Sequence, residues 1–187
     1  EVEKAHPDVL ELFYQVFDKG SLEDGEGTSV DFRNTVILLT TNLGSETIWE
    51  ACAAGARPDT ESLAQTIRPE LVSHFKPALL GRMVAVPYFP LKADQMERIV
   101  RLKLAKIAKR FEAQHRAAFS WDDALVSLIA SRAGEMDSGA RMVDNILTGT
   151  LLPDLSIQIL DQMAEGEAFE TVHVSVDGDG GFRFEMG

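Results

Sequence analysis

One short segment, residues 34–41, limits the folds open to this chain more than any other part of the sequence. It reads NTVILLTT, a continuous run of β-branched and apolar residues. Such a run is too short for a helix, but it is typical of a strand that is covered on both faces, as the strands of parallel sheets are. A second strand is predicted at residues 83–89. The two segments indicate an α/β fold with a parallel sheet.

The residues on either side of this run predict a helix, a hairpin and a loop. From Glu1 to Asp18, apolar residues recur at spacings of three and four, with Pro7 in the first regular turn, and Gly20 ends the pattern. Residues 22–27 hold two glycines among polar residues, which favours a tight turn between two short extended pieces. Residues 43–65 are interrupted by glycine and proline, so they predict a short helix and then an exposed loop.

A change of composition after Pro90 predicts a domain boundary, with residues 1–90 and 91–187 as the two domains. A long amphipathic helix opens at residues 91–94, and its outer face carries lysine and arginine. That basic face could bind a phosphate or a partner, or it could simply be the side of the helix that faces solvent. The second case is the commoner one. The remaining predicted elements are a strand near residues 118–120, a helix from about residue 121 to Gly134, a helix from about Ser138 to Met163 that bends at Pro153, and a closing hairpin of residues 171–176 and 182–186.

Charge and composition exclude several classes of function. Acidic residues outnumber basic ones by 30 to 18, and the net charge of −12 opposes binding to the phosphate backbone of nucleic acids. No apolar run approaches the roughly 18 residues of a membrane helix. The single cysteine, Cys52, and four scattered histidines give no basis for a disulfide or a metal site. We expect a soluble, cytoplasmic protein without nucleic-acid partners, membrane insertion or protein-held metal.

The sequence also carries a family resemblance, which rests on two strings at its start. These are EVEKAHPDVLELFYQVFDKGSLEDGEG and VDFRNTVILLTTNLGS, and they resemble the second nucleotide-binding domain of the Clp/Hsp100 ATPases of the AAA+ class. The resemblance continues through Gly139–Arg141 to the closing hairpin and is weakest over residues 46–66. Residues 75–91 read FKPALLGRMVAVPYFPL. This string looks more like the ClpV branch, the ATPases of type VI secretion, than like the ClpB disaggregases.

For the fold, the resemblance implies the C-terminal part of an AAA+ domain. Residues 1–90 would be the second half of the large subdomain, after the Walker B aspartate, with an incomplete parallel sheet and helices. Residues 91–187 would be the Clp-type small subdomain, mainly helical and ending in a β-hairpin. Because the family's sheet has the strand order 5-1-4-3-2, residues 34–41 and 83–89 would be its fourth and fifth strands, with no mutual ladder. We expect the first 90 residues to be poorly protected unless upstream residues or another subunit cover them.

The resemblance also implies two residues that act on the attacking water. Glu1 matches the Walker B glutamate, whose carboxylate polarises the water that attacks the γ-phosphate. Without the resemblance, Glu1 is simply an acid at a helix start, where the helix dipole favours it. Asn42 matches the sensor-1 residue that orients the same water, and the alternative role for Asn42 is an N-cap of the helix that follows.

Two arginines complete the implied site. Arg82 matches the arginine finger that reaches into the nucleotide site of the next subunit, although a glycine precedes it where many relatives have asparagine. An ion pair with an acid on its own surface is the alternative, and Lys76 is a candidate for a second basic contact. Arg141 matches the sensor-2 arginine that contacts the bound nucleotide, and the alternative is a salt bridge to Asp137 or Asp144.

The implied function is that of a ring-forming ATPase. The parent protein would be a hexamer that uses ATP and Mg²⁺ to pull on a protein substrate, which in ClpV relatives is the contracted secretion sheath. The alternatives are a general disaggregase of the ClpB kind and, for this chain alone, a non-catalytic assembly and hinge module. The phosphate-loop pattern GxxxxGK[ST] does not occur in the sequence, so we expect the chain alone neither to hold ATP tightly nor to hydrolyse it.

Overall fold

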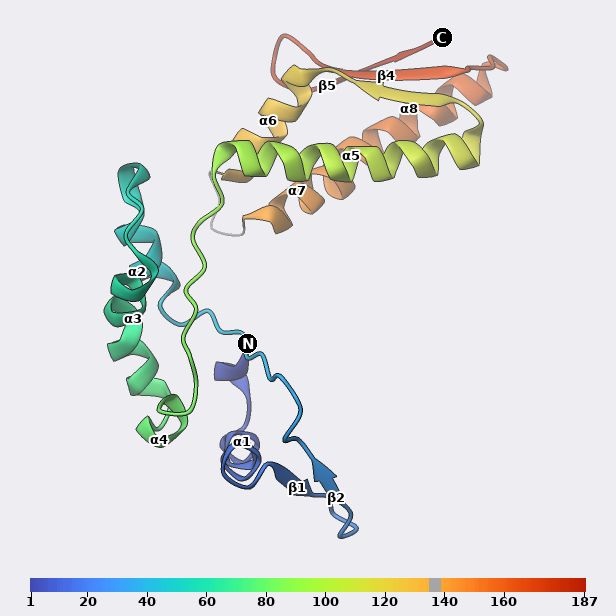
Figure 1. Ribbon diagram of the computed structural model, residues 1–187. Coiled ribbons are helices and arrows are strands. Elements are labelled where there is room, and N and C mark those ends of the chain that lie inside the picture. The colour runs from blue at the N-terminus through green and yellow to red at the C-terminus, as the bar shows by residue number, and fades with distance from the viewer. Residues whose placement is uncertain (135–138) are drawn as a thin grey trace. The chain divides into compact units, whose positions relative to one another are not determined.

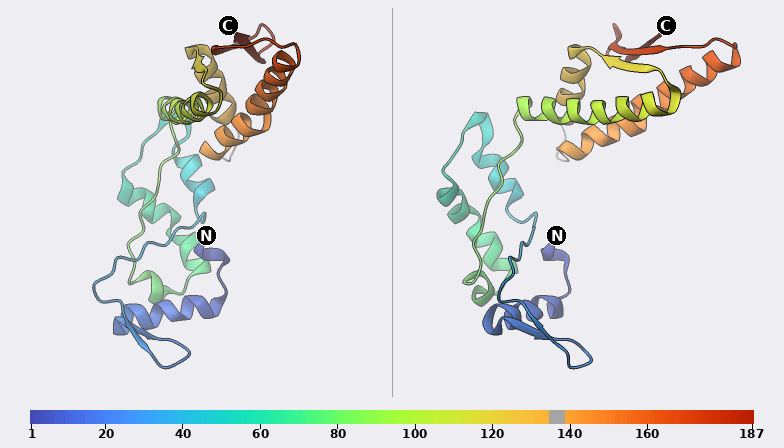
Figure 2. Two further views of the ribbon diagram at one scale, coloured as in Figure 1. Left: turned by 90° about the vertical axis from the view of Figure 1, so that its right-hand side faces the viewer. Right: turned by 45° about the vertical axis from the view of Figure 1, so that its right-hand side comes forward.

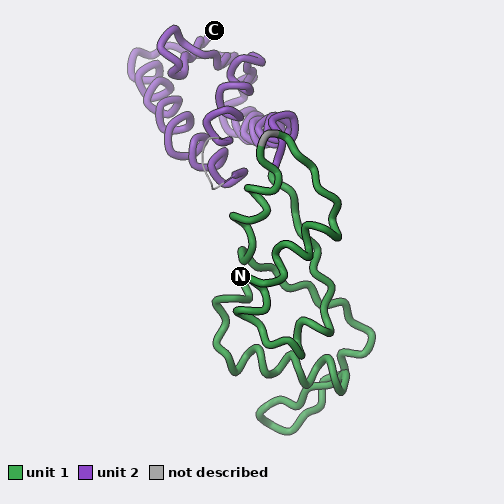
Figure 3. The backbone as a smooth tube through the Cα atoms, turned by 90° about the vertical axis from the view of Figure 1, so that its left-hand side faces the viewer, with its two compact units in different colours: residues 1–90 green, residues 91–187 purple. Residues whose placement is uncertain are grey.

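The structure, a computed structural model, describes residues 1–134 and 139–187. The chain divides into two units, Glu1–Pro90 and Leu91–Gly187 (Figure 3). Each unit has a hydrophobic core of its own. The described residues contain helices and two small sheets, so the predicted α/β class is confirmed. None of the helices in these residues is long and apolar enough to cross a membrane.

The first unit opens with a helix and a hairpin, as predicted (Figure 1). Helix α1, Pro7–Lys19, has Pro7 in its first turn and is closed by Gly20, whose φ of 69° is left-handed. Strands β1 (Ser21–Glu23) and β2 (Ser29–Asp31) pair antiparallel. The other elements of this unit are the 3₁₀ helices η1 (Val2–Lys4) and η2 (Ala53–Gly55) and the helices α2 (Ser45–Ala51), α3 (Thr60–His74) and α4 (Pro77–Leu80).

Helix α3 begins inside the region that the sequence predicts as a loop. Its N-cap is Asp59, whose carboxylate accepts a hydrogen bond from the Ser62 amide at 2.8 Å. Its buried side chains follow at intervals of four residues on one helix face: Leu63, Ile67 and Leu71. The loop prediction for residues 60–65 is therefore wrong. Two of the three apolar residues that mark the helix lie beyond residue 65, and Pro69 in the same stretch argues against a helix.

The two strands predicted for a parallel sheet in this unit are also wrong. Residues 34–41 and 83–89 are extended chain without strand pairing (Figure 1, Figure 2). The side chains of Val36, Leu38 and Val84 are 87%, 86% and 88% exposed. A strand exists only beside a neighbour, and no described segment forms a ladder with either one. The predicted strand order, with these segments as the fourth and fifth strands, stays a prediction.

The second unit follows the predicted order of elements, with its strands on one side of its helices (Figure 1, Figure 2). Strand β3 (Ala118–Trp121) runs parallel to β4 (Thr171–Val176), and β4 pairs antiparallel with β5 (Phe182–Met186), which confirms the closing hairpin. The predicted helix start at Ser138 lies outside the described residues. The helices are α5 (Ala93–His115), α6 (Asp123–Gly134), α7 (Ala140–Ile146), the π-helical η3 (Leu147–Leu151) and α8 (Leu152–Ala164), with Pro153 in the first turn of α8.

The second unit has the larger core. Its largest fully buried side chains come from every described helix except α8 and from the central strand: Val100, Leu104, Leu125, Val126, Ile129, Val143, Leu151, Val172 and Val174. In the first unit, the buried cluster is Ile67, Leu71, Phe75 and Leu79. Residues 34–41 add no buried side chain to that cluster, because their apolar face has no cover among the described residues.

Amide exchange tests this contrast between the two units. In the isolated chain, we expect residues 36–39 to exchange with deuterium at nearly the rate of an unfolded peptide, because their amides donate no hydrogen bond to a described residue. Strand β4, which is paired on both sides, should be protected in the same sample and serves as the internal control. Slow exchange throughout residues 36–39 of a monomer would contradict the prediction.

Candidate functional site

The first residues of the chain lie against residues 40–42. The Val2 amide donates a hydrogen bond to the Thr40 carbonyl oxygen at 2.9 Å, and the Asn42 amide donates to Glu3 Oε1 at 3.5 Å. Two of the predicted site residues, Glu1 and Asn42, therefore belong to segments that are hydrogen-bonded to each other.

Glu1 is exposed and paired with a lysine on the next turn. Lys4 Nζ lies 2.7 Å from Glu1 Oε1. This hydrogen bond and the charge of Lys4 hold the pKa of Glu1 below its usual range, so the carboxylate is ionised at neutral pH. The Glu1 side chain makes no capping hydrogen bond to η1. An ionised, exposed carboxylate is the form that can accept a proton from water.

Glu3 is a site residue that the sequence does not reveal. Hydrogen bonds from the Thr41 side chain and the Asn42 amide hold the pKa of the Glu3 carboxyl below its usual range. Its carbonyl oxygen lies 2.8 Å from His74 Nε2, at the end of α3. The second carboxylate oxygen, Oε2, is buried without a hydrogen-bond partner among the described residues. Glu3 thus connects the segment of Glu1 to the segment of Asn42 and to α3.

Asn42 leaves its side chain available for a ligand. The side-chain amide makes no hydrogen bond to a described residue, and the N-cap of α2 is Gly44, so the N-cap alternative for Asn42 is wrong. Only glycine suits this cap, because its φ is +80° and a Cβ would lie 2.9 Å from the Ile67 side chain. Glu70 Oε2 accepts a hydrogen bond from the Gly44 amide at 3.0 Å and fixes this turn to α3.

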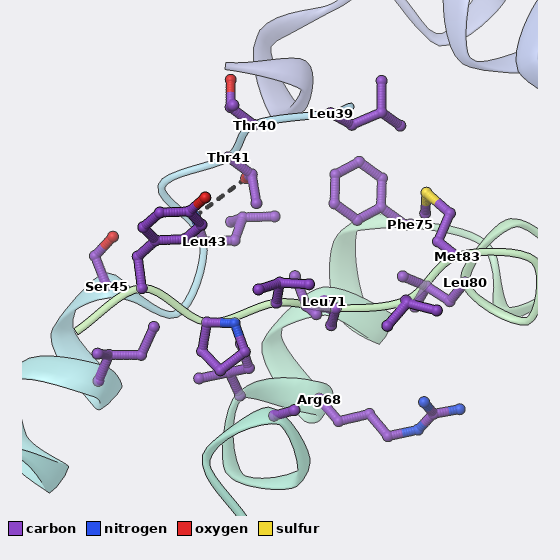
Figure 4. Close-up of a pocket in the computed structure, with 18 of the residues that line it drawn as sticks. Leu39, Thr40, Thr41, Leu43, Ser45, Arg68, Leu71, Phe75, Leu80 and Met83 are labelled. Atoms are coloured by element: carbon purple, nitrogen blue, oxygen red, sulfur yellow. Dashed lines mark hydrogen bonds between the residues drawn. The ribbon is translucent and has the colours of Figure 1, made fainter. Parts of the chain in front are cut away.

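A cavity of about 700 Å³ lies between residues 39–43, α3 and residues 83–88 (Figure 4). In Figure 4, Leu39, Phe75 and Met83 lie around one space, whereas the guanidinium of Arg68 extends away from it. Apolar side chains dominate the lining, to which Asn42 also contributes. The cavity suits an apolar segment of chain better than a phosphate group. The sequence gives no sign of it, because it arises from three segments that are distant in sequence.

Arg82 is held by an acid of its own unit. Asp18 Oδ1 accepts hydrogen bonds from Arg82 Nε at 2.7 Å and lies 2.5 Å from Nη2, and the Ala78 carbonyl oxygen accepts from Nη1 at 2.7 Å. The alternative of a surface ion pair is therefore present in the structure. The Arg82 side chain nevertheless remains 40% exposed, so it can also meet a partner from outside.

Lys76, the candidate second basic contact, has a similar arrangement. Its ammonium group pairs with Glu11 and lies 5.8 Å from the centre of the Tyr14 ring. The hydrogen bond to Glu11 and the charge of that carboxylate raise the pKa of Lys76. Lys76 and Arg82 flank the short helix α4, and both are oriented by acids of α1.

Arg141 stands at the start of α7 in the second unit. It is exposed, and its side chain makes no hydrogen bond or ion pair with a described residue. Asp144 lies 2.5 Å from Lys103 Nζ and forms no ion pair with Arg141, so the alternative of an Arg141–Asp144 salt bridge is wrong. Asp137, the other alternative partner, lies outside the described residues. A cation at a helix N-terminus is disfavoured by the helix dipole, which favours an anionic ligand for it.

The structure thus brings some of the predicted site residues together. Hydrogen bonds join the segments of Glu1 and Asn42, whereas Arg82 lies near the opposite end of α1, and Arg141 belongs to the other unit. No group of three His, Cys, Asp or Glu side chains within residues 1–134 and 139–187 could hold a metal ion.

Two family models match the chain. Residues 1–86 match the model described as an AAA domain of the Cdc48 subfamily, and residues 91–174 match the C-terminal D2-small domain of ClpB protein. Together these matches extend over most of both units.

The chain is similar to two curated proteins in particular. It is 53% identical over 176 residues to the AAA+ ATPase ClpV1 of Pseudomonas aeruginosa, an alignment that covers 94% of this chain and 20% of the relative. It is 42% identical over 161 residues to the chaperone protein ClpB of Yersinia enterocolitica, covering 86% of this chain and 18% of that protein. The chain therefore spans about a fifth of the length of these relatives.

A solved structure has a similar fold. It is a closed-state cryo-EM reconstruction of Hsp104 with ATPγS and FITC-casein, and the match has a TM-score of 0.81 at 28% sequence identity. The match covers 100% of this chain and 31% of the Hsp104 chain.

Proposed function

Since the chain belongs to the Clp/Hsp100 family of AAA+ ATPases, we propose that it is part of a ring-forming enzyme that uses ATP hydrolysis to disassemble the contracted sheath of a type VI secretion system. The string at residues 75–91 and the 53% identity to ClpV1, against 42% to a ClpB, support the ClpV branch. The ring would be a cytoplasmic hexamer.

The observation that carries the enzymatic role is the hydrogen-bonded contact between the segments of Glu1 and Asn42. An ionised carboxylate and an unpartnered amide on neighbouring segments can hold one water molecule between them. Glu1 would accept the proton of that water, and Asn42 would orient it toward the γ-phosphate. Hydrolysis of the terminal phosphate of bound ATP, with Mg²⁺, would supply the energy.

The two arginines would act on the nucleotide from other directions. Arg82, exposed and held by Asp18, would reach the phosphate of the nucleotide bound by the adjoining subunit. Arg141, an exposed cation without a partner among the described residues, would contact the nucleotide of its own subunit and make the position of the second unit depend on it. The phosphate loop and the Walker B aspartate would come from preceding residues of a longer protein. The 187-residue chain alone would then be inactive.

A general disaggregase is the second candidate. The match of residues 91–174 to the ClpB D2-small model favours it, as does the 42% identity to a ClpB. A third hypothesis concerns the isolated chain, which could serve as a non-catalytic assembly and hinge module. The well-packed core of the second unit supports this hypothesis.

The experiment compares two substrates for the full-length protein. Purified protein and ATP are added to contracted sheath tubules and, separately, to a heat-aggregated model enzyme. We expect tubules to shorten in electron micrographs only when ATP is present, and no recovery of the aggregated enzyme. Recovery of that enzyme with intact tubules would support the disaggregase instead.

A further inference from the structure

The contact between Asp18 and Arg82 fixes the guanidinium group on two sides. Asp18 Oδ1 receives Nε and Nη2, and the Ala78 carbonyl oxygen receives Nη1. A guanidinium has five N–H donors, so these contacts use three of them and leave two for a ligand. Because the side chain is 40% exposed, the two remaining donors can reach a group outside the protomer.

Asp18 belongs to a row of residues along one face of α1. Glu11, Tyr14 and Asp18 are spaced by three and four residues, which places them on the same side of the helix. Glu11 and Tyr14 hold Lys76, and Asp18 holds Arg82. The two basic residues that flank α4 are thus both oriented by this one helix face.

Helix α1 is a firm support for such a contact. Val16 is buried, and four other residues of the helix pack on the cluster formed by α3 and α4: Leu10, Phe13, Tyr14 and Phe17. Asp18 is the last residue but one of this packed helix, so its carboxylate has a defined position relative to α4. A carboxylate on a loop would not give the same constraint.

We propose that Asp18 is a positioning residue for Arg82, which it orients so that the free N–H groups face the phosphate held by the adjoining subunit. This inference rests on the proposed function of Arg82. The Asp18–Arg82 pair lies at the surface, where water screens the negative charge of Asp18. That charge therefore weakens the attraction between Arg82 and a phosphate only slightly. Loss of orientation has the larger effect, because a displacement of about 1 Å can lower a rate about 100-fold.

The test uses the full-length ATPase with four variants: Asp18→Ala, Asp18→Asn, Arg82→Ala and the double variant with Asp18→Ala and Arg82→Ala. We expect Asp18→Ala to lower kcat about 10- to 100-fold with the KM for ATP within about 2-fold. Asp18→Asn keeps an oxygen acceptor and should lose less. The double variant should be no slower than Arg82→Ala, since Asp18 acts only through Arg82.

A matched control is Asp31→Ala, which removes another exposed aspartate–arginine pair of the first unit, with Arg33, and should change kcat by less than about 2-fold. Unchanged or faster turnover in Asp18→Ala, or additive losses in the double variant, would overturn the inference while the role of Arg82 stands. Loss of the hexamer in both Asp18 variants would also overturn it, in favour of an assembly role. Full activity in Arg82→Ala would instead refute the proposed function of Arg82.

Discussion

Replacing Arg82 with alanine in the full-length ring should lower kcat for ATP hydrolysis by about 10³- to 10⁵-fold, the usual effect of an arginine finger. The reason is that charge develops on the transferred phosphoryl group, and in the proposed ring the Arg82 cation of the adjoining subunit would neutralise it. Hexamer formation and nucleotide binding should remain intact, because the Arg82 side chain is exposed and its only hydrogen-bond partners among the described residues are Asp18 and the Ala78 carbonyl. Steady-state kinetics, sedimentation and binding of a fluorescent nucleotide measure the three properties.

Arg183→Ala is a suitable control for this variant. Arg183 is another exposed arginine, paired with Glu185 on strand β5, and its loss should leave turnover unchanged. If Arg82→Ala lost the ring and not only turnover, the result would favour the assembly and hinge module instead.

Replacing Glu1 with glutamine should also stop turnover, with kcat lowered by about 10²- to 10⁴-fold, the range for a general base. Glutamine has the same shape but cannot accept a proton, so the nucleotide should still bind. The hydrogen bond from Lys4 and its charge hold the pKa of Glu1 low, so the proposed base is fully ionised at neutral pH. It becomes protonated only at a pH below the usual pKa of a glutamate. We therefore expect that Glu1 causes no change of kcat with pH between about pH 6 and pH 8.

The natural control for Glu1 is Glu1→Asp, which keeps the base on a shorter side chain and should retain some activity. Turnover of the Glu1→Gln variant at the rate of the unchanged protein would exclude Glu1 as the base.

Mixing the two inactive proteins tests whether Arg82 acts between subunits. In a mixed ring, a subunit with Arg82→Ala still has Glu1, and a neighbour with Glu1→Gln still offers Arg82. Such a pair contains one complete site, so mixed rings should recover part of the activity. Rings that stay inactive at every mixing ratio would place Arg82 in its own subunit's site or outside the reaction.

Local patterns in the sequence were sufficient for most helices and for both hairpins. The long helix of residues 93–115 follows from its apolar stripe, and the turn at Gly20 follows from one residue type. The parallel strand at residues 34–41 could not be judged in this way. Its composition is that of a buried strand. A strand also needs a neighbouring strand to pair with, and the local sequence does not say whether one is present. No described segment pairs with residues 34–41.

The candidate site shows the same limit. The resemblance to the family pointed to Glu1, Asn42, Arg82 and Arg141, whose chemistry remains a proposal. Glu3 and Asp18 could not be found from the sequence, because each acts on a residue far along the chain: Glu3 meets Asn42 39 residues later, and Asp18 meets Arg82 64 residues later. Their spacing from the motif residues has no chemical meaning until the fold brings the partners together.

The uncovered segments at residues 34–41 and 83–89 have a consequence for handling the protein. Most of their apolar side chains are exposed, and most of their backbone groups have no partner among the described residues, which is the condition under which chains join edge to edge and aggregate. The isolated piece should therefore precipitate at concentrations at which the longer protein stays in solution. In a longer protein of the kind proposed, any strand encoded before residue 1 would leave the ribosome first and could pair with these segments as they emerge.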